Sequence, residues 1–72
     1  MSQPKMRVDK YGIKQWWLNH NLHREDGPAI EYPDGQKQWY LNDEKVSWEQ
    51  VFRQAKNPEI ELRILSAALI TF

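Results

Sequence analysis

The sequence contains no cysteine among its 72 residues, so no disulfide can stabilise the fold. Chains of this size form small cores, and they usually need disulfides, a metal, a partner or dense packing for useful stability. The lack of cysteine, together with the lack of a charged and then apolar N-terminal segment, favours a reducing compartment over secretion. We therefore expect a cytoplasmic protein that forms a single domain over residues 1–72.

Long apolar runs are missing as well. The longest candidate, residues 62–72, is interrupted by Arg63, Ser66 and Thr71, and it is much shorter than the ~20 residues that a membrane span requires. The sequence therefore predicts no membrane association.

An excess of charge of one sign is also absent, because ten basic residues balance ten acidic ones. Nucleic-acid binding usually needs clustered Lys and Arg to neutralise phosphates, so the overall balance does not favour it. The balance is nevertheless uneven, since residues 1–24 hold five basic residues and one acidic residue. A nucleic-acid-binding regulator that uses this basic N-terminal half therefore stays an alternative.

Few side chains are suited to catalysis. Without cysteine, nucleophilic chemistry would depend on hydroxyls such as Ser2, Ser47 and Ser66, and none of them lies in a recognisable pattern with a base and an oxyanion site. The sequence also has no Gly-rich phosphate loop. We therefore predict a non-enzymatic protein without a cofactor.

Aromatic residues are abundant, with four Trp, three Tyr and two Phe. Each large ring brings more buried area than an aliphatic side chain. We expect aromatic packing to take the place of the missing disulfides.

A nine-residue pattern occurs twice, 23 residues apart. Residues 11–19 read YGIKQWWLN and residues 34–42 read DGQKQWYLN, with identical residues at six positions. The same offset aligns residues 6–9 with residues 29–32, so that each copy reads as a strand, a glycine turn and an aromatic strand. We therefore predict a four-stranded antiparallel meander of two repeated β-hairpins over residues 6–46.

Aromatic side chains are expected on both faces of this sheet. Successive strand residues point to opposite faces, so Trp16 and Trp39 share one face while Trp17 and Tyr40 share the other. Large rings anchor protein interfaces, and we predict Trp17 and Tyr40 as protein-binding residues. The assignment inverts if the helices cover the other face, and packing of both faces, by helices and by a dimer partner, is the alternative.

The periodicity changes after Ser47, where apolar residues at 48, 51, 52 and 55 follow the spacing of a helix. Ser47 and Gln50 form a capping-box pattern, and Asn57 followed by Pro58 predicts the start of a second helix. The predicted fold class is therefore α+β, with two C-terminal helices forming a cap over residues 47–72.

The second helix is unusually apolar toward its end. Its apolar residues exceed what one stripe can bury against a small sheet, so part of this surface should meet another chain. We predict a homodimer whose interface contains Ile64, Leu65, Leu69 and Phe72.

The connection between the hairpins, residues 20–28, is rich in turn-forming and titratable residues. His20 and His23 could share a metal ion with Glu25 or Asp26, because imidazole and carboxylate groups are zinc ligands. Alternatively, Asp26 accepts backbone N–H bonds in the turn, and His23 and Arg24 hold the loop to the sheet or to Asp26. We favour the loop interpretation, and we also include His23 and Arg24 among the predicted protein-binding residues.

Residues 16–35 resemble repeat units of the form W-Y-L-N-G-K-x-H-R-x-D-G-P-A, found in small, mostly uncharacterised proteins of bacteriophages and bacteria. Residues 23–29, HREDGPA, are the most specific part of the resemblance. The units are also similar to MORN repeats, which form hairpins with a Y-x-D-G turn. The second copy departs from the pattern after Asn42, so it looks like a terminal unit that is capped by helices.

The resemblance implies an interaction scaffold, since MORN proteins bind proteins or membrane lipids, and it transfers no catalytic residues. The leading hypothesis is a phage or prophage accessory protein that acts in the host cytoplasm. It would bind and inhibit or modulate a host protein, such as a component of a bacterial defence system. The alternatives are the nucleic-acid-binding regulator and a self-assembling structural module.

Overall fold

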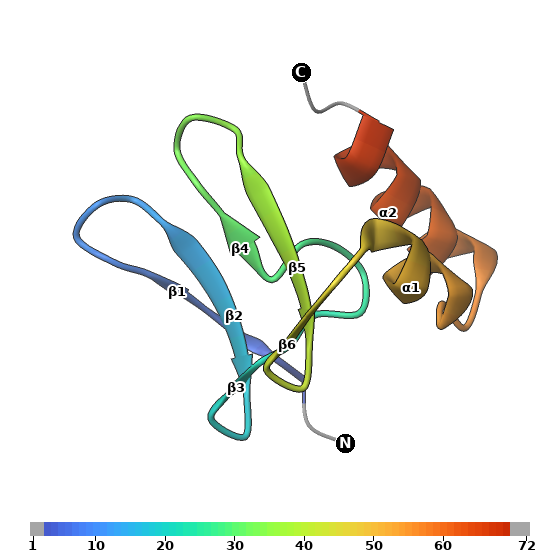
Figure 1. The fold of residues 1–72 in the computed structure, drawn as a ribbon, viewed down its shortest axis with the longest axis horizontal. Coiled ribbons are helices and arrows are strands. Elements are labelled where there is room, and N and C mark those ends of the chain that lie inside the picture. The colour runs from blue at the N-terminus through green and yellow to red at the C-terminus, as the bar shows by residue number, and fades with distance from the viewer. Residues whose placement is uncertain (1–2, 70–72) are drawn as a thin grey trace.

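The computed structural model describes residues 3–69, which form an antiparallel sheet beside two helices (Figure 1). The elements are β1 (Lys5–Val8), β2 (Lys14–Leu18), β3 (Asn21–Leu22), β4 (Ile30–Glu31), β5 (Lys37–Leu41), β6 (Glu44–Val46), α1 (Trp48–Arg53) and α2 (Pro58–Leu69). The predicted α+β class and the two C-terminal helices are confirmed. The predicted number of four strands is wrong, because the sheet has six.

The two additional strands arise because each copy of the repeat forms three strands. β3 and β6 follow β2 and β5 through tight turns at Asn19 and His20 and, 23 residues later, at Asn42 and Asp43. All four turn residues have positive φ, between 50° and 68°. Turns with two residues of positive φ match the twist of a hairpin, and Asn and Asp tolerate this conformation better than most residues.

The predicted glycine turns are confirmed in both copies. Gly12 has φ 80° and Gly35 has φ 95°, a region that disfavours residues with a Cβ atom. The N–H of Gly12 donates to the carbonyl of Asp9 at 3.0 Å, and the N–H of Gly35 donates to the carbonyl of Tyr32 at 3.0 Å. The repeated sequence therefore forms the same turn twice.

The two units join through β2 and β4, and the strand order is β1-β2-β4-β5-β6, with β3 also paired with β2. β3 and β4 share one edge of β2, because residues 17–18 pair with β3 and residues 14–15 pair with β4. All four residues of β1 pair with residues 14–17 along the other edge of β2. β1 is therefore an outer strand of the sheet.

The helices cover the second unit on the face that carries Trp39. A buried cluster of Trp39, Leu41, Val51 and Ile64 forms the centre of the core. The capping box of Ser47 and Gln50 at the start of α1 is confirmed. Burial of the apolar stripe of each helix against this sheet stabilises short helices that would be marginal alone.

The start of α2 also agrees with the prediction. The side-chain oxygen of Asn57 accepts a hydrogen bond from the N–H of Ile60 at 2.9 Å, and the helix begins at Pro58. Among residues 3–69, no helix has the length and apolar character needed to cross a bilayer.

Candidate binding surface

One face of the sheet is turned away from the helices. Cross-strand partners point to the same face, and this places Lys5 beside Trp17 and Lys45 beside Tyr40. We call this surface the open face, and the strand residues that form it are Lys5, Arg7, Gln15, Trp17, Leu22, Ile30, Gln38, Tyr40 and Lys45. It contains both aromatic residues that the sequence predicted for recognition.

The open face carries positive charge. Its strand residues include Lys5, Arg7 and Lys45, whereas the acidic strand residues Glu31 and Glu44 pair across to Lys14 and Leu41 on the opposite face. Sequence reasoning missed Lys5 and Lys45. The alternation of side chains along a strand also places these residues on the open face, but only once the register between strands is known.

The ring of Trp17 is held in place on this face, because its Nε1 donates a hydrogen bond to the side-chain oxygen of Gln15 at 3.2 Å. An open hollow of about 530 Å³ lies next to the ring, and its lining includes Lys5, Arg7 and His20. Trp17 and Tyr40 are both half-buried, so each ring keeps part of its surface available. A partner side chain could therefore enter beside a fixed ring and two cationic groups.

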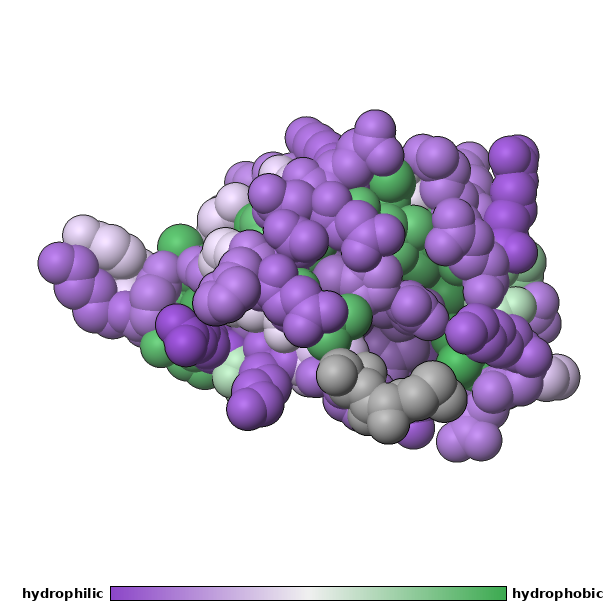
Figure 2. All heavy atoms as spheres, turned by 90° about the horizontal axis from the view of Figure 1, so that it is seen from below, coloured by the Kyte–Doolittle hydropathy of each residue, from purple (hydrophilic) through white to green (hydrophobic). Residues whose placement is uncertain are grey.

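Where the described residues are visible, the end of the molecule at the bottom of Figure 1 shows no large apolar patch (Figure 2). Polar residues cover most of that end, and apolar residues appear between them in small groups (Figure 2). Polar and charged contacts must therefore contribute to any recognition at this end.

Arg24 organises the loop between β3 and β4. Its guanidinium carbon lies 3.8 Å from the ring centroid of Trp16, which is a close cation–π stack. Nε donates to Asp26 at 2.9 Å, and Nη1 donates to Glu31 at 3.0 Å and to the carbonyl of Pro28 at 3.1 Å. Arg24 therefore ties the loop to β2 and β4 through internal contacts.

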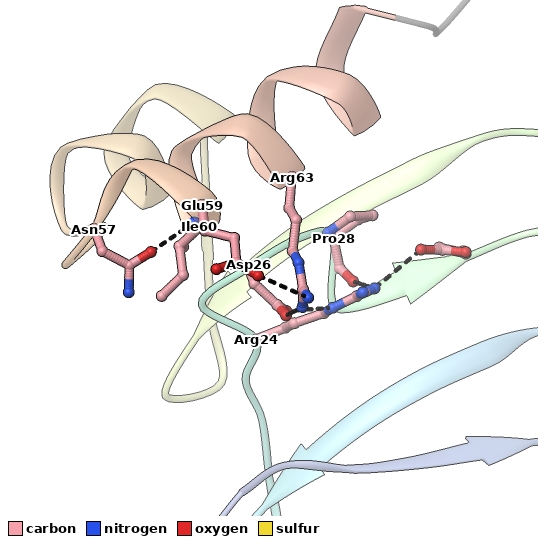
Figure 3. A network of polar contacts seen from close by, with 8 residues as sticks. Arg24, Asp26, Pro28, Asn57, Glu59, Ile60 and Arg63 are labelled. Carbon is pink, nitrogen blue, oxygen red and sulfur yellow. Dashed lines mark hydrogen bonds and ion pairs between the residues drawn. The ribbon is translucent and has the colours of Figure 1, made fainter.

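Asp26 extends this network to α2. Its second carboxylate oxygen accepts a hydrogen bond from Arg63 at 3.2 Å, so that one carboxylate lies between two guanidinium groups (Figure 3). Burial raises the pKa of Asp26, but the hydrogen bonds and charges of Arg24 and Arg63 lower it by more, and its pKa lies below the ordinary value of 3.8. The sequence interpretation expected backbone N–H groups and Arg24 as partners of Asp26; the contact with Arg24 is confirmed, and Arg63 of α2 is a partner that it did not expect.

His23 is buried in the same loop, with 6% of its surface exposed. Its Nδ1 accepts a hydrogen bond from the backbone N–H of Asn42 at 3.0 Å, so Nε2 carries the proton and donates to Glu25 at 2.9 Å. Nδ1 thus ties the loop to the turn between β5 and β6, and Nε2 makes a contact within the loop. The predicted loop-ordering roles of His23 and Arg24 are confirmed.

This burial changes the set of predicted protein-binding residues. The ring of His23 has almost no exposed surface, and the side chain of Arg24 is 20% exposed and engaged by internal partners. His23 is therefore too buried for the predicted direct contact with a partner, whereas the contact of Arg24 with a partner stays a prediction. Within residues 3–69, no group of three or more His, Asp or Glu side chains is arranged to hold a metal ion.

The residues of the predicted dimer interface differ in their exposure. Ile64 is fully buried in the core, so it cannot contribute to an interface as predicted, because the helix turns it toward the sheet. Leu65 is half-buried and Leu69 is 68% exposed, while Phe72 lies outside the described residues. Leu62, which the predicted interface did not include, is 67% exposed, and its seven-residue separation from Leu69 places both on one side of α2. The homodimer stays a prediction.

Comparison of the chain with family models, with curated proteins and with solved structures gave no significant match.

Proposed function

We propose that the chain is a non-enzymatic binding module that docks an acidic surface of a partner protein onto its open face. The supporting observation is that this face combines two aromatic rings with three basic strand residues, against the carboxylate of Asp9, which accepts a hydrogen bond from Gln15 at 3.4 Å. Aromatic anchors contribute most of the energy in many protein interfaces, and complementary charge sets their specificity and association rate. An acidic protein surface with an apolar centre suits both features.

The resemblance to phage-type repeat units supports a host protein as this partner. An accessory protein of a phage or prophage that covers such a surface would inhibit or modulate the host protein without any chemistry of its own. This agrees with the use of His23, Arg24 and Asp26 for holding a loop in place.

The experiment is affinity capture from bacterial lysate with the purified chain, followed by mass spectrometry. The partner should be recovered stoichiometrically at low salt, and it should be depleted at high salt because exposed charges are screened. The double variant Trp17→Ala, Tyr40→Ala should lose the partner. Tyr11→Ala is the matched control, because Tyr11 is 70% exposed in the turn after β1 and does not belong to the open face.

Retention of the same partner by the double variant would show that the open face is not the binding surface. Recovery of no stoichiometric partner, combined with a fixed oligomer in light scattering, would favour the self-assembling module instead.

A second candidate function is binding of single-stranded nucleic acid, which the same basic and aromatic residues favour. Bases stack on exposed rings while lysine and arginine contact the phosphates. Gel shifts at two salt concentrations test this candidate, since phosphate contacts weaken steeply as salt rises. An unshifted oligonucleotide at low salt would exclude it.

A further inference from the structure

β1 is the outer strand of the first unit, and its equivalent in the second unit is paired on both sides. β4 pairs with β2 along one edge and with β5 along the other. Among the described residues, β1 pairs with β2 alone. The offset of 23 residues aligns Arg7 and Val8 with Ile30 and Glu31, so the first unit lacks a strand pairing that its copy has.

The backbone groups on the outer edge of β1 can be assigned from the neighbouring strand. Trp16 donates its N–H to Ala29 at 2.9 Å and accepts from His23 at 3.0 Å, both on the side of β2 away from β1. Hydrogen-bonded and non-hydrogen-bonded pairs alternate along an antiparallel ladder. Met6, opposite Trp16, and Val8, two residues further, therefore direct their N–H and C=O groups outward.

The duplication shows what such an outward group does when a strand is present. Met6 is equivalent to Ala29, whose carbonyl accepts the N–H of Trp16 and so joins the second unit to the first. All four residues of β1 are exposed. The N–H of Ala29 donates to Gln38 within the second unit at 2.9 Å, so the outward carbonyl is the group of this edge whose equivalent is paired in the second copy.

The side chains of β1 determine which strand can fill it. Lys5 and Arg7 project on the open face, while Met6 and Val8 project on the opposite face and are 48% and 54% exposed. Two copies of β1 paired with each other would place like charges together on one face, which is destabilising. A strand with acidic residues at alternate positions would instead neutralise Lys5 and Arg7.

We infer that β1 binds an extended acidic segment of a partner protein as an added antiparallel strand. Backbone hydrogen bonds to Met6 and Val8 hold the segment, and its acidic side chains face Lys5 and Arg7 on the open face. Its apolar side chains cover Met6 and Val8. This inference rests on the proposed function for the class of partner, and it extends the binding surface from the face of the sheet to its edge.

The test uses an acetylated and amidated peptide of sequence SEVEVES, with SQVQVQS as the uncharged control. At saturation, SEVEVES should slow hydrogen exchange at the amides of Met6 and Val8 by about tenfold or more, because exchange then requires release of the strand. SQVQVQS should bind about tenfold more weakly. The peptide affinity should also fall as salt rises.

Met6→Pro separates strand addition from other binding modes. Proline removes the outward N–H, and it is tolerated at an edge where the N–H faces solvent. The variant should keep its thermal transition and lose peptide binding by about tenfold or more, whereas Met6→Ala, which retains the N–H, should bind within about twofold of the parent chain. If Met6→Pro does not fold, the exchange measurement on the unmodified chain still decides.

Unchanged exchange at Met6 and Val8 in the presence of bound peptide would overturn the inference, as would equal affinity for the two peptides. Protection of these amides by a short oligothymidylate, but not by the peptide, would overturn it in favour of nucleic acid. The proposed function fails separately, when the Trp17→Ala, Tyr40→Ala variant retains its partner from lysate. The two outcomes are therefore distinguishable.

Discussion

Replacing Arg24 by lysine keeps the charge but removes the planar fork and the stacking surface of the guanidinium. In the structure, this group contacts the carboxylates of Asp26 and Glu31, the carbonyl of Pro28 and the ring of Trp16. A lysine ammonium can reach only part of this set. The substitution therefore tests whether geometry or charge holds the loop.

The expected magnitude follows from these contacts. The side chains are partly exposed, at 20% for Arg24 and 34% for Asp26, so each ion pair contributes at most about 1 kcal/mol. The stack on Trp16 contributes about 0.5–2 kcal/mol, and the bond to the Pro28 carbonyl about 1 kcal/mol. Loss of the stack and one or two bonds predicts that Arg24→Lys lowers the free energy of unfolding by about 2 kcal/mol.

Chemical and thermal unfolding followed by circular dichroism measure this change. A loss of about 2 kcal/mol corresponds to a fall in Tm of about 8–16 °C for a domain of this size. Arg53→Lys, at an exposed position near the end of α1, is the matched control and should stay within about 0.5 kcal/mol of the parent chain. If Arg24→Lys is as stable as this control, charge alone holds the loop and the geometric reasoning is wrong.

Three further outcomes concern the same loop and its helix. Gly27→Ala should destabilise by about 1–3 kcal/mol in urea unfolding, because the new Cβ would lie 2.8 Å from the guanidinium carbon of Arg24; an unchanged midpoint would mean that Arg24 moves freely. Asn57→Ala should cost about 0.5–2 kcal/mol in the same assay, with Asn57→Asp as the variant that retains a cap. The pKa of Asp26 is lowered in the folded chain, so its contribution to stability is complete above about pH 4 and is lost as the pH falls through the lowered pKa. The free energy of unfolding of Asp26→Asn, measured between neutral and acidic pH, should lack this part of the pH dependence. An identical pH dependence for the variant and the parent chain would contradict the lowered pKa of Asp26.

Most of the fold could be predicted because its signals are local. The duplicated glycine turns and aromatic strands, the capping box at Ser47 and the cap at Asn57 all depend on residues that are close in the sequence. β3 and β6 could not be predicted in the same way, because they contain only two and three residues. Their turns use Asn, His and Asp at positive φ, where sequence reasoning looks first for glycine.

The candidate site likewise has features that follow from the local sequence and features that depend on tertiary structure. Alternation within each strand and the 23-residue repeat are enough to place Trp17 and Tyr40 on one face. Their basic neighbours Lys5 and Lys45 lie outside the repeated aromatic strands, and their placement depends on register. Burial depends on tertiary packing in the same way. The sequence predicted contacts with other chains for His23 and Ile64, but the turn at Asn42 buries His23 and the packing of α2 on the sheet buries Ile64.

The two units protect their equivalent tryptophans by different means. Trp39 is 8% exposed beneath the helices, whereas Trp16 is half-buried and covered by the guanidinium of Arg24. The offset that aligns the tryptophans also aligns Arg24 with Ser47, the N-cap of α1. The chain therefore leaves the second unit as a helix at the position where it leaves the first unit as a hydrogen-bonded loop. The buried cluster joins the helices to the second unit, so the repeat has a capped end at α1 and α2 and an unpaired strand edge at β1, which is the edge where we infer that the added strand binds.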